Sequence, residues 1–124
     1  MADKSDNYQE LQELHQRALE GYQEMHDLAL GLLEGIRTGL DSNKLSELLK
    51  TKDNRADKLL EMANEIAELR QSIKDSGGHV KILKSSVDKF NEKLQPIMTK
   101  IIRIDNEIGE ELKRTGIRIS NRNP

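Results

Sequence analysis

The sequence contains no cysteine and no tryptophan, and only three of its 124 residues are aromatic, namely Tyr8, Tyr22 and Phe90. Without cysteine the chain has neither a disulfide framework nor thiolate chemistry, which is typical of proteins in a reducing compartment. Proteins that bind single-stranded nucleic acids stack bases on several aromatic rings, and proteins that bind phosphates carry a basic field. With so few aromatic rings and a net charge of −2, the chain is not expected to bind nucleic acid.

Long apolar runs are also missing. The N-terminal sequence MADKSDNYQELQ does not contain the apolar run of a signal peptide. No uncharged stretch approaches the roughly 18 residues that a membrane-spanning helix needs. These features predict a cytoplasmic protein without a membrane span.

The motifs of enzymes and metal proteins are absent as well. Helical di-iron proteins place a Glu three residues before a ligating His, but Gln or Ser occupies that position before His15, His26 and His79. Neither a P-loop nor a GxGxxG sequence occurs. His15 falls on an apolar seam, where a core histidine is more common than a ligand. We therefore predict that the protein is not an enzyme and has no catalytic, cofactor-binding or metal-binding residues.

What the sequence does contain is apolar residues at alternating steps of three and four. One such seam runs from Tyr8 to Ile36, a second from Leu45 to Ile73 and a third from Val80 to Ile108. An average step of 3.5 is typical of helices that pack lengthwise against one another. The pattern predicts an all-α fold, an antiparallel bundle of three to four long helices with coiled-coil-like packing.

The second seam is weak in its first half. Residues 50–58 contain a single apolar side chain, which allows a short helix near 42–50 that bends or loosens before a longer helix near 56–75. The favoured interpretation is instead that the two basic residues on this part of the seam, Lys52 and Arg55, extend past the core toward solvent. The number of helices depends on which of these holds.

The ends of the helices are marked by capping and turn residues. Gly39 and Gly116 are placed to end the first and third helices, and the DSGG sequence at 75–78 favours a turn between the second and third. Side chains that can cap a first turn are Ser5, Asp6 and Asn7 for the first helix and Asp41 or Ser42 for the second.

Pro96 lies inside the third seam. Proline removes a helical hydrogen bond, so this position predicts either a kink in one helix or the first turn of a new helix. We expect a single domain over residues 1–124, with flexible tails at 1–5 and 116–124.

The charges are distributed unevenly. Residues 6–37 hold seven acidic residues and two arginines, a net charge of −5, whereas the chain after Glu111 holds four basic residues and no acid. Such a basic tail either folds back on the acidic helix, contacts a partner, or remains a solvated end.

The third segment has more apolar residues than one bundle face would bury. Ile102 lies off the seam, Met98 and Leu112 widen its edge, and Ile117 and Ile119 follow it. A surplus of this kind is typical of a contact surface, which a partner's amphipathic helix can occupy. A dimer interface or a fourth packed helix is the alternative.

Three segments carry a resemblance to a known family. They are LLEGIRTGLD at the end of the first predicted helix, LSELLKTKDNRADKLLEMANEI in the middle, and IIRIDNEIGEELKR near the C-terminus. In the middle segment, Leu45, Leu48 and Leu49 precede a charged stretch and a second leucine-rich helix. With these features the chain resembles the flagellar export chaperones of the FlgN and FliT type, which are small cytoplasmic helical proteins of bacteria.

The resemblance implies a chaperone that keeps hook-associated or filament-cap subunits soluble and delivers them to the flagellar type III export machinery. In that family the C-terminal helical region grips the terminal amphipathic segment of the client. Carried over to this chain, the partner-binding residues are Ile97, Ile101, Ile104, Ile108 and Leu112. The alternative prediction is a coiled-coil structural adaptor, or a homodimerising module, without an export client.

Overall fold

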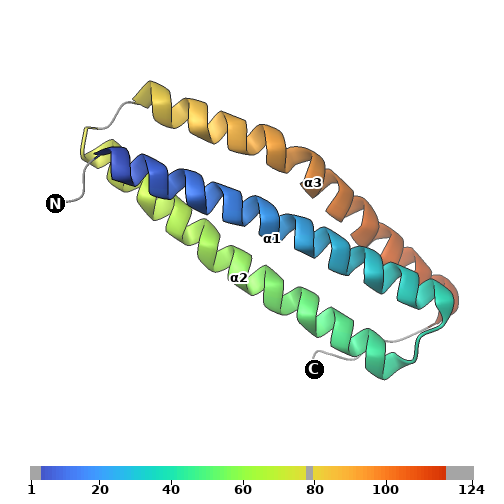
Figure 1. Cartoon of the computed structure of the whole chain (residues 1–124). Coiled ribbons are helices and arrows are strands. Elements are labelled where there is room, and N and C mark those ends of the chain that lie inside the picture. The colour runs from blue at the N-terminus through green and yellow to red at the C-terminus, as the bar shows by residue number, and fades with distance from the viewer. Residues whose placement is uncertain (1–3, 78–79, 117–124) are drawn as a thin grey trace.

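Three long helices make up the computed structural model of the protein, which describes residues 4–77 and 80–116 (Figure 1). They are α1 (Lys4–Thr38), α2 (Ser42–Asp75) and α3 (Val80–Thr115). No strand occurs among the described residues. The predicted all-α bundle is confirmed, with three helices rather than four.

The turn between α1 and α2 has the conformation that its capping residues predict. Gly39 has a φ of 80°, a left-handed conformation that favours glycine, and the Leu40 amide donates to the Gly35 carbonyl over 2.9 Å. Asp41 caps α2, since its Oδ1 accepts a hydrogen bond of 2.9 Å from the Lys44 amide. The predicted cap for α2 is therefore confirmed.

The start of α1 differs from its prediction. The helix already begins at Lys4, so the three residues expected to cap it lie inside its first turn, and that prediction was wrong. The acidic, Gln-rich sequence that follows propagates a helix well enough to extend it past these polar residues.

One helix, α2, runs unbroken from Ser42 to Asp75. The two basic seam residues extend past the core and pair with acids on other helices. Lys52 Nζ lies 3.4 Å from Asp105 Oδ1 on α3, and Arg55 Nη2 lies 2.8 Å from Glu24 Oε2 on α1. The favoured prediction of extended basic side chains is confirmed, and the alternative of two helices was wrong.

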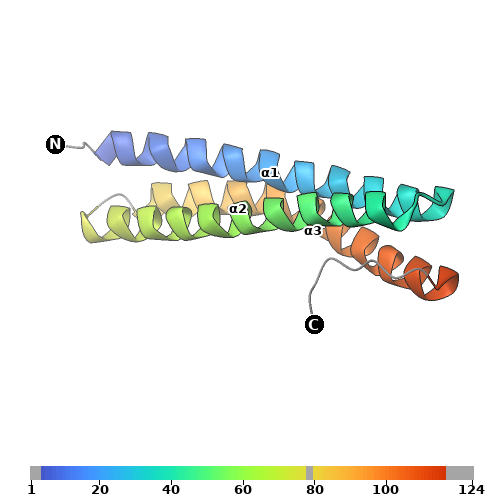
Figure 2. The same ribbon diagram turned by 90° about the horizontal axis from the view of Figure 1, so that it is seen from below.

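Pro96 lies in the middle of α3 without ending it. The helix turns away from α2 over its C-terminal half, as Figure 2 shows, which is consistent with the missing hydrogen bond at a proline. At the end of α3, Gly116 has a φ of 70° and donates to the Leu112 carbonyl over 3.0 Å. The tail 117–124, and with it Ile117 and Ile119, lies outside the described residues.

The central helix is α1, which packs along both α2 and α3 (Figure 1). By contrast, α2 and α3 contact each other at few points. Two apolar clusters form the core, and each draws on all three helices. The largest fully buried side chains are Leu11, Leu32, Leu33, Leu45 and Ile73. None of the described helices has an apolar stretch that would cross a bilayer.

Candidate partner-binding groove

The five residues inferred to bind a partner lie mainly inside the bundle. Ile101, Ile104 and Ile108 are 4%, 7% and 8% exposed, and the last two belong to the core cluster that includes α1. Ile97 and Leu112 are half-buried, and Leu112 packs against the same cluster. All five lie along one side of α3, but in this conformation three of them have little surface left for a partner.

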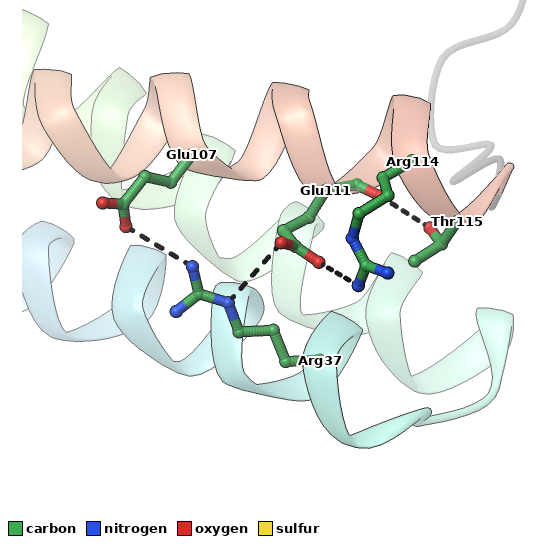
Figure 3. Close-up of polar contacts among 5 residues, drawn as sticks. All are labelled: Arg37, Glu107, Glu111, Arg114 and Thr115. Atoms are coloured by element: carbon green, nitrogen blue, oxygen red, sulfur yellow. Dashed lines mark hydrogen bonds and ion pairs between the residues drawn. The ribbon is translucent and has the colours of Figure 1, made fainter.

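Polar contacts hold this half of α3 against α1 (Figure 3). The Arg37 guanidinium lies 3.9 Å from Glu107 Oε2 and 3.8 Å from Glu111 Oε1. Glu111 also accepts a 2.7 Å hydrogen bond from Arg114, and this bond lowers the pKa of the Glu111 carboxyl. Its carbonyl accepts the Thr115 hydroxyl over 2.7 Å. The two ion pairs of Arg37 join the end of α3 to α1, whereas the bonds of Arg114 and Thr115 lie within α3.

One opening in the described part of the molecule lies between α2 and α3. Here we define the α2/α3 groove, whose larger hollow has a volume of about 500 Å³ near the turn that joins the two helices. Its lining residues are Ala67, Arg70, Gln71 and Lys74 of α2, and Val80, Leu83, Lys84 and Val87 of α3.

A second hollow of about 100 Å³ continues the groove, and Arg70 lines both. Here α1 also contributes to the lining. The residues are Ala18 and Tyr22 of α1, Leu59, Ala63 and Ile66 of α2, and Phe90 of α3. The buried members of this set lie deepest, whereas Ala63 and Ala67 are exposed on the wall formed by α2. Apolar side chains therefore line part of each hollow, and the two hollows meet at the charged side chain of Arg70.

Two exposed apolar side chains lie on the same two helices. Leu60, 64% exposed, lies three residues before Ala63 on the same face of α2. Ile102, 56% exposed, lies three residues before Asp105, which reaches α2 through its ion pair with Lys52. The predicted position of Ile102 off the seam is confirmed by its exposure. The Lys52–Asp105 ion pair connects α2 and α3 near this residue.

The charge of the groove is positive. Arg70, Lys74 and Lys84 line the larger hollow, and none of the described residues that line either hollow is acidic. The chain as a whole has a net charge of −2, so this positive field is local. Such a field attracts anionic groups and repels cationic ones.

At the centre of the groove, Arg70 joins a buried cluster with His15 of α1 and Phe90 of α3. The His15 and Phe90 rings stack with centroids 4.4 Å apart, and the Arg70 guanidinium carbon lies 5.8 Å from the Phe90 centroid. Arg70 Nη2 lies 3.0 Å from His15 Nε2. Since arginine has no acceptor, His15 Nε2 accepts this bond and the ring is neutral, with its proton on Nδ1.

Burial determines the ionisation of the cluster. It lowers the pKa of His15 from 6.5 to about 4, with a further contribution from the charge on Arg70. Burial also lowers the pKa of Arg70, which nevertheless stays charged. His15 was predicted to be a core residue, and its 6% exposure confirms that position.

Comparisons with known proteins do not assign the chain to a family: no family model, no curated protein and no solved structure matches it. Among residues 4–77 and 80–116, no group of three or more potential ligand side chains is placed to hold a metal ion. The α2/α3 groove is the feature with a shape and a charge from which a function can be argued.

Proposed function

We propose that the protein is a cytoplasmic chaperone of flagellar type III export, which holds an amphipathic segment of a hook-associated or filament-cap subunit before secretion. The three segments that resemble the FlgN and FliT type support the client class. The α2/α3 groove supports the mode of binding, because it lies between two described helices that contact each other at few points.

A helix laid in this groove would complete a four-helix arrangement. Its apolar face would cover the apolar floor, of which Leu83, Ile66 and Phe90 are part. A client helix gains about 25 cal/mol for each Å² of apolar surface that it buries. Association and ordering of the segment oppose this gain by several kcal/mol. We expect a dissociation constant in the micromolar to nanomolar range, which permits release at the export gate.

This proposal moves the client site from the seam of α3 to the open side of the bundle. Ile101, Ile104 and Ile108 already pack inside, so binding a client with them would first require α3 to part from α1. Their role as a client-binding set stays a prediction that the same experiments test.

The test is binding of the purified chain to synthetic peptides that span the C-terminal segments of hook-associated and cap subunits, measured by fluorescence anisotropy. Val80 and Ile82 form a matched pair, since both are exposed at the start of α3 and only Val80 lines the groove. We expect Val80→Asp to weaken binding at least tenfold and Ile82→Asp to leave it within twofold.

Two outcomes count against the proposal. Absence of binding to every client peptide by the folded chain would remove the export-chaperone function. A stable dimer in sedimentation that buries the groove would favour the homodimerising module instead.

A further inference from the structure

We infer that Arg70 selects the occupant of the α2/α3 groove by binding a carboxylate, so that the groove accepts an acidic amphipathic helix of a partner protein. The inference rests on the proposed function and adds the chemistry of the client segment. The observations that carry it are the position of Arg70, the lack of a carboxylate partner for it among the described residues, and the charges around it.

Arg70 lies where the two hollows of the groove meet, and its side chain is half-buried there. Its guanidinium is held in place on two sides, by the bond to His15 and by the Phe90 ring. Because the guanidinium is already held in place, its N–H donors lose little conformational entropy when a ligand binds. This favours binding of a planar carboxylate.

The donors of Arg70 are only partly used. Its Nε is buried and has no hydrogen-bond partner among the described residues. Within residues 4–77 and 80–116, no carboxylate forms an ion pair with Arg70. Because the Nε has almost no exposed surface, an occupant of the groove does not reach that atom. A carboxylate of the occupant would instead neutralise the charge of this half-buried side chain.

The charged residues around Arg70 also favour an acidic ligand. Lys74 lies one turn along α2, and Lys84 lies across the groove on α3. Three cations around an apolar floor complement a helix that carries acids at the edges of its apolar face, spaced three or four residues apart. A basic helix would meet three like charges.

The occupant is therefore a helix with one Glu or Asp near the centre of its apolar face, opposite Arg70, and further acids toward Lys74 and Lys84. A second copy of this chain that docks groove to groove is a weaker fit, because its own groove presents the same three cations. Self-association is nevertheless an outcome that the test can register.

The test is a double-mutant cycle with the full chain. Two synthetic amphipathic peptides are used, derived from the client segment that binds best in the experiments above, with either Glu or Gln at the central position. Proteins are the wild type, Arg70→Gln, and the control Lys58→Gln, which removes an exposed lysine of α2 outside the groove. Circular dichroism checks that each variant is folded.

We expect the wild type and Lys58→Gln to bind the Glu peptide about tenfold more tightly than the Gln peptide. Arg70→Gln is expected to bind the two peptides within twofold of each other. Because this variant also loses the bond to His15, the pair Lys74→Gln and Lys84→Gln provides a second test at exposed positions. We expect each to weaken binding of a peptide with flanking acids and to reduce the salt dependence of that binding.

Equal binding of both peptides to the wild type would overturn the role of Arg70 while leaving the proposed function intact. Failure of all client peptides to bind would instead remove the proposed function and this inference together. Concentration-dependent dimerisation that Arg70→Gln abolishes would assign the groove to a second copy and overturn the inference.

Discussion

His15 is neutral in the folded protein, although histidine has an ordinary pKa of 6.5. Its folded pKa of about 4 lies below the unfolded value, so protonation favours the unfolded chain. The contribution of neutral His15 to stability is complete above pH 6.5 and falls away as the pH drops toward 4. Over that window the free energy of unfolding is expected to fall by about 3 kcal/mol.

Urea unfolding of the wild type and His15→Gln at several pH values between 4 and 7 checks this prediction. Glutamine retains an acceptor for Arg70 but does not titrate. Carboxylates such as Asp27, whose pKa is lowered by its hydrogen bond from His26, are common to both proteins. The difference between the two pH profiles therefore isolates His15, and parallel profiles would show that His15 is not the titrating group.

Neighbouring isoleucines of α3 differ in how much they contribute to the stability of the fold. Ile104 is 7% exposed and packs in the core, whereas Ile102 is 56% exposed. We predict that Ile104→Ala lowers the free energy of unfolding by about 2–4 kcal/mol, because it leaves a cavity. Ile102→Ala is expected to change it by less than about 0.5 kcal/mol. If urea unfolding shows equal losses of unfolding free energy for the two variants, α3 packs on a different face.

At the scale of helices, two glycines lie inside helical segments with room for a side chain. A Cβ at Gly31 of α1 or Gly109 of α3 would meet no other atom within 4 Å. We predict that Gly31→Ala and Gly109→Ala each raise the free energy of unfolding by about 0.5–1 kcal/mol, because alanine restricts the unfolded chain and favours helix.

Gly39→Ala is the control for these substitutions. Its φ of 80° lies in the left-handed region, where alanine is strained by roughly 1–2 kcal/mol. Thermal denaturation should separate the variants by the sign of the change in Tm. Stabilisation by Gly39→Ala would contradict the turn geometry between α1 and α2.

The helices differ in how well their sequences predict them. In α1 and α3 the periodicity predicts the helical segments and most of their buried residues, although Pro96 left open whether α3 is one helix or two. In α2 the seam carries Lys52 and Arg55, and local composition does not decide between one helix and two there. Their partners Asp105 and Glu24 are distant in sequence, so the continuity of α2 depends on contacts that periodicity does not contain.

The proposed client-binding surface was harder to predict than the core. A heptad seam marks the residues that any packed helix buries, and the inferred partner-binding set followed that seam. The α2/α3 groove instead depends on how far the helices diverge, which is a property of the whole packing. Arg70 lies between the seam residues Leu69 and Ile73, and spacing does not reveal that it meets His15 and Phe90 from the other helices.

At the scale of the molecule, α1 is the helix on which the other two pack, and the open side between α2 and α3 is the surface available to a partner. The central claim is that this groove receives a client helix. Methyl NMR of the chain labelled at alanine and isoleucine, titrated with a client segment, tests it most directly.

The account predicts shifts of the Ala63 and Ala67 methyl resonances on the wall of the groove, with the Ile82 resonance unchanged. Shifts confined to Ile108 or Ile82, with Ala63 and Ala67 unmoved by a segment that binds, would contradict it.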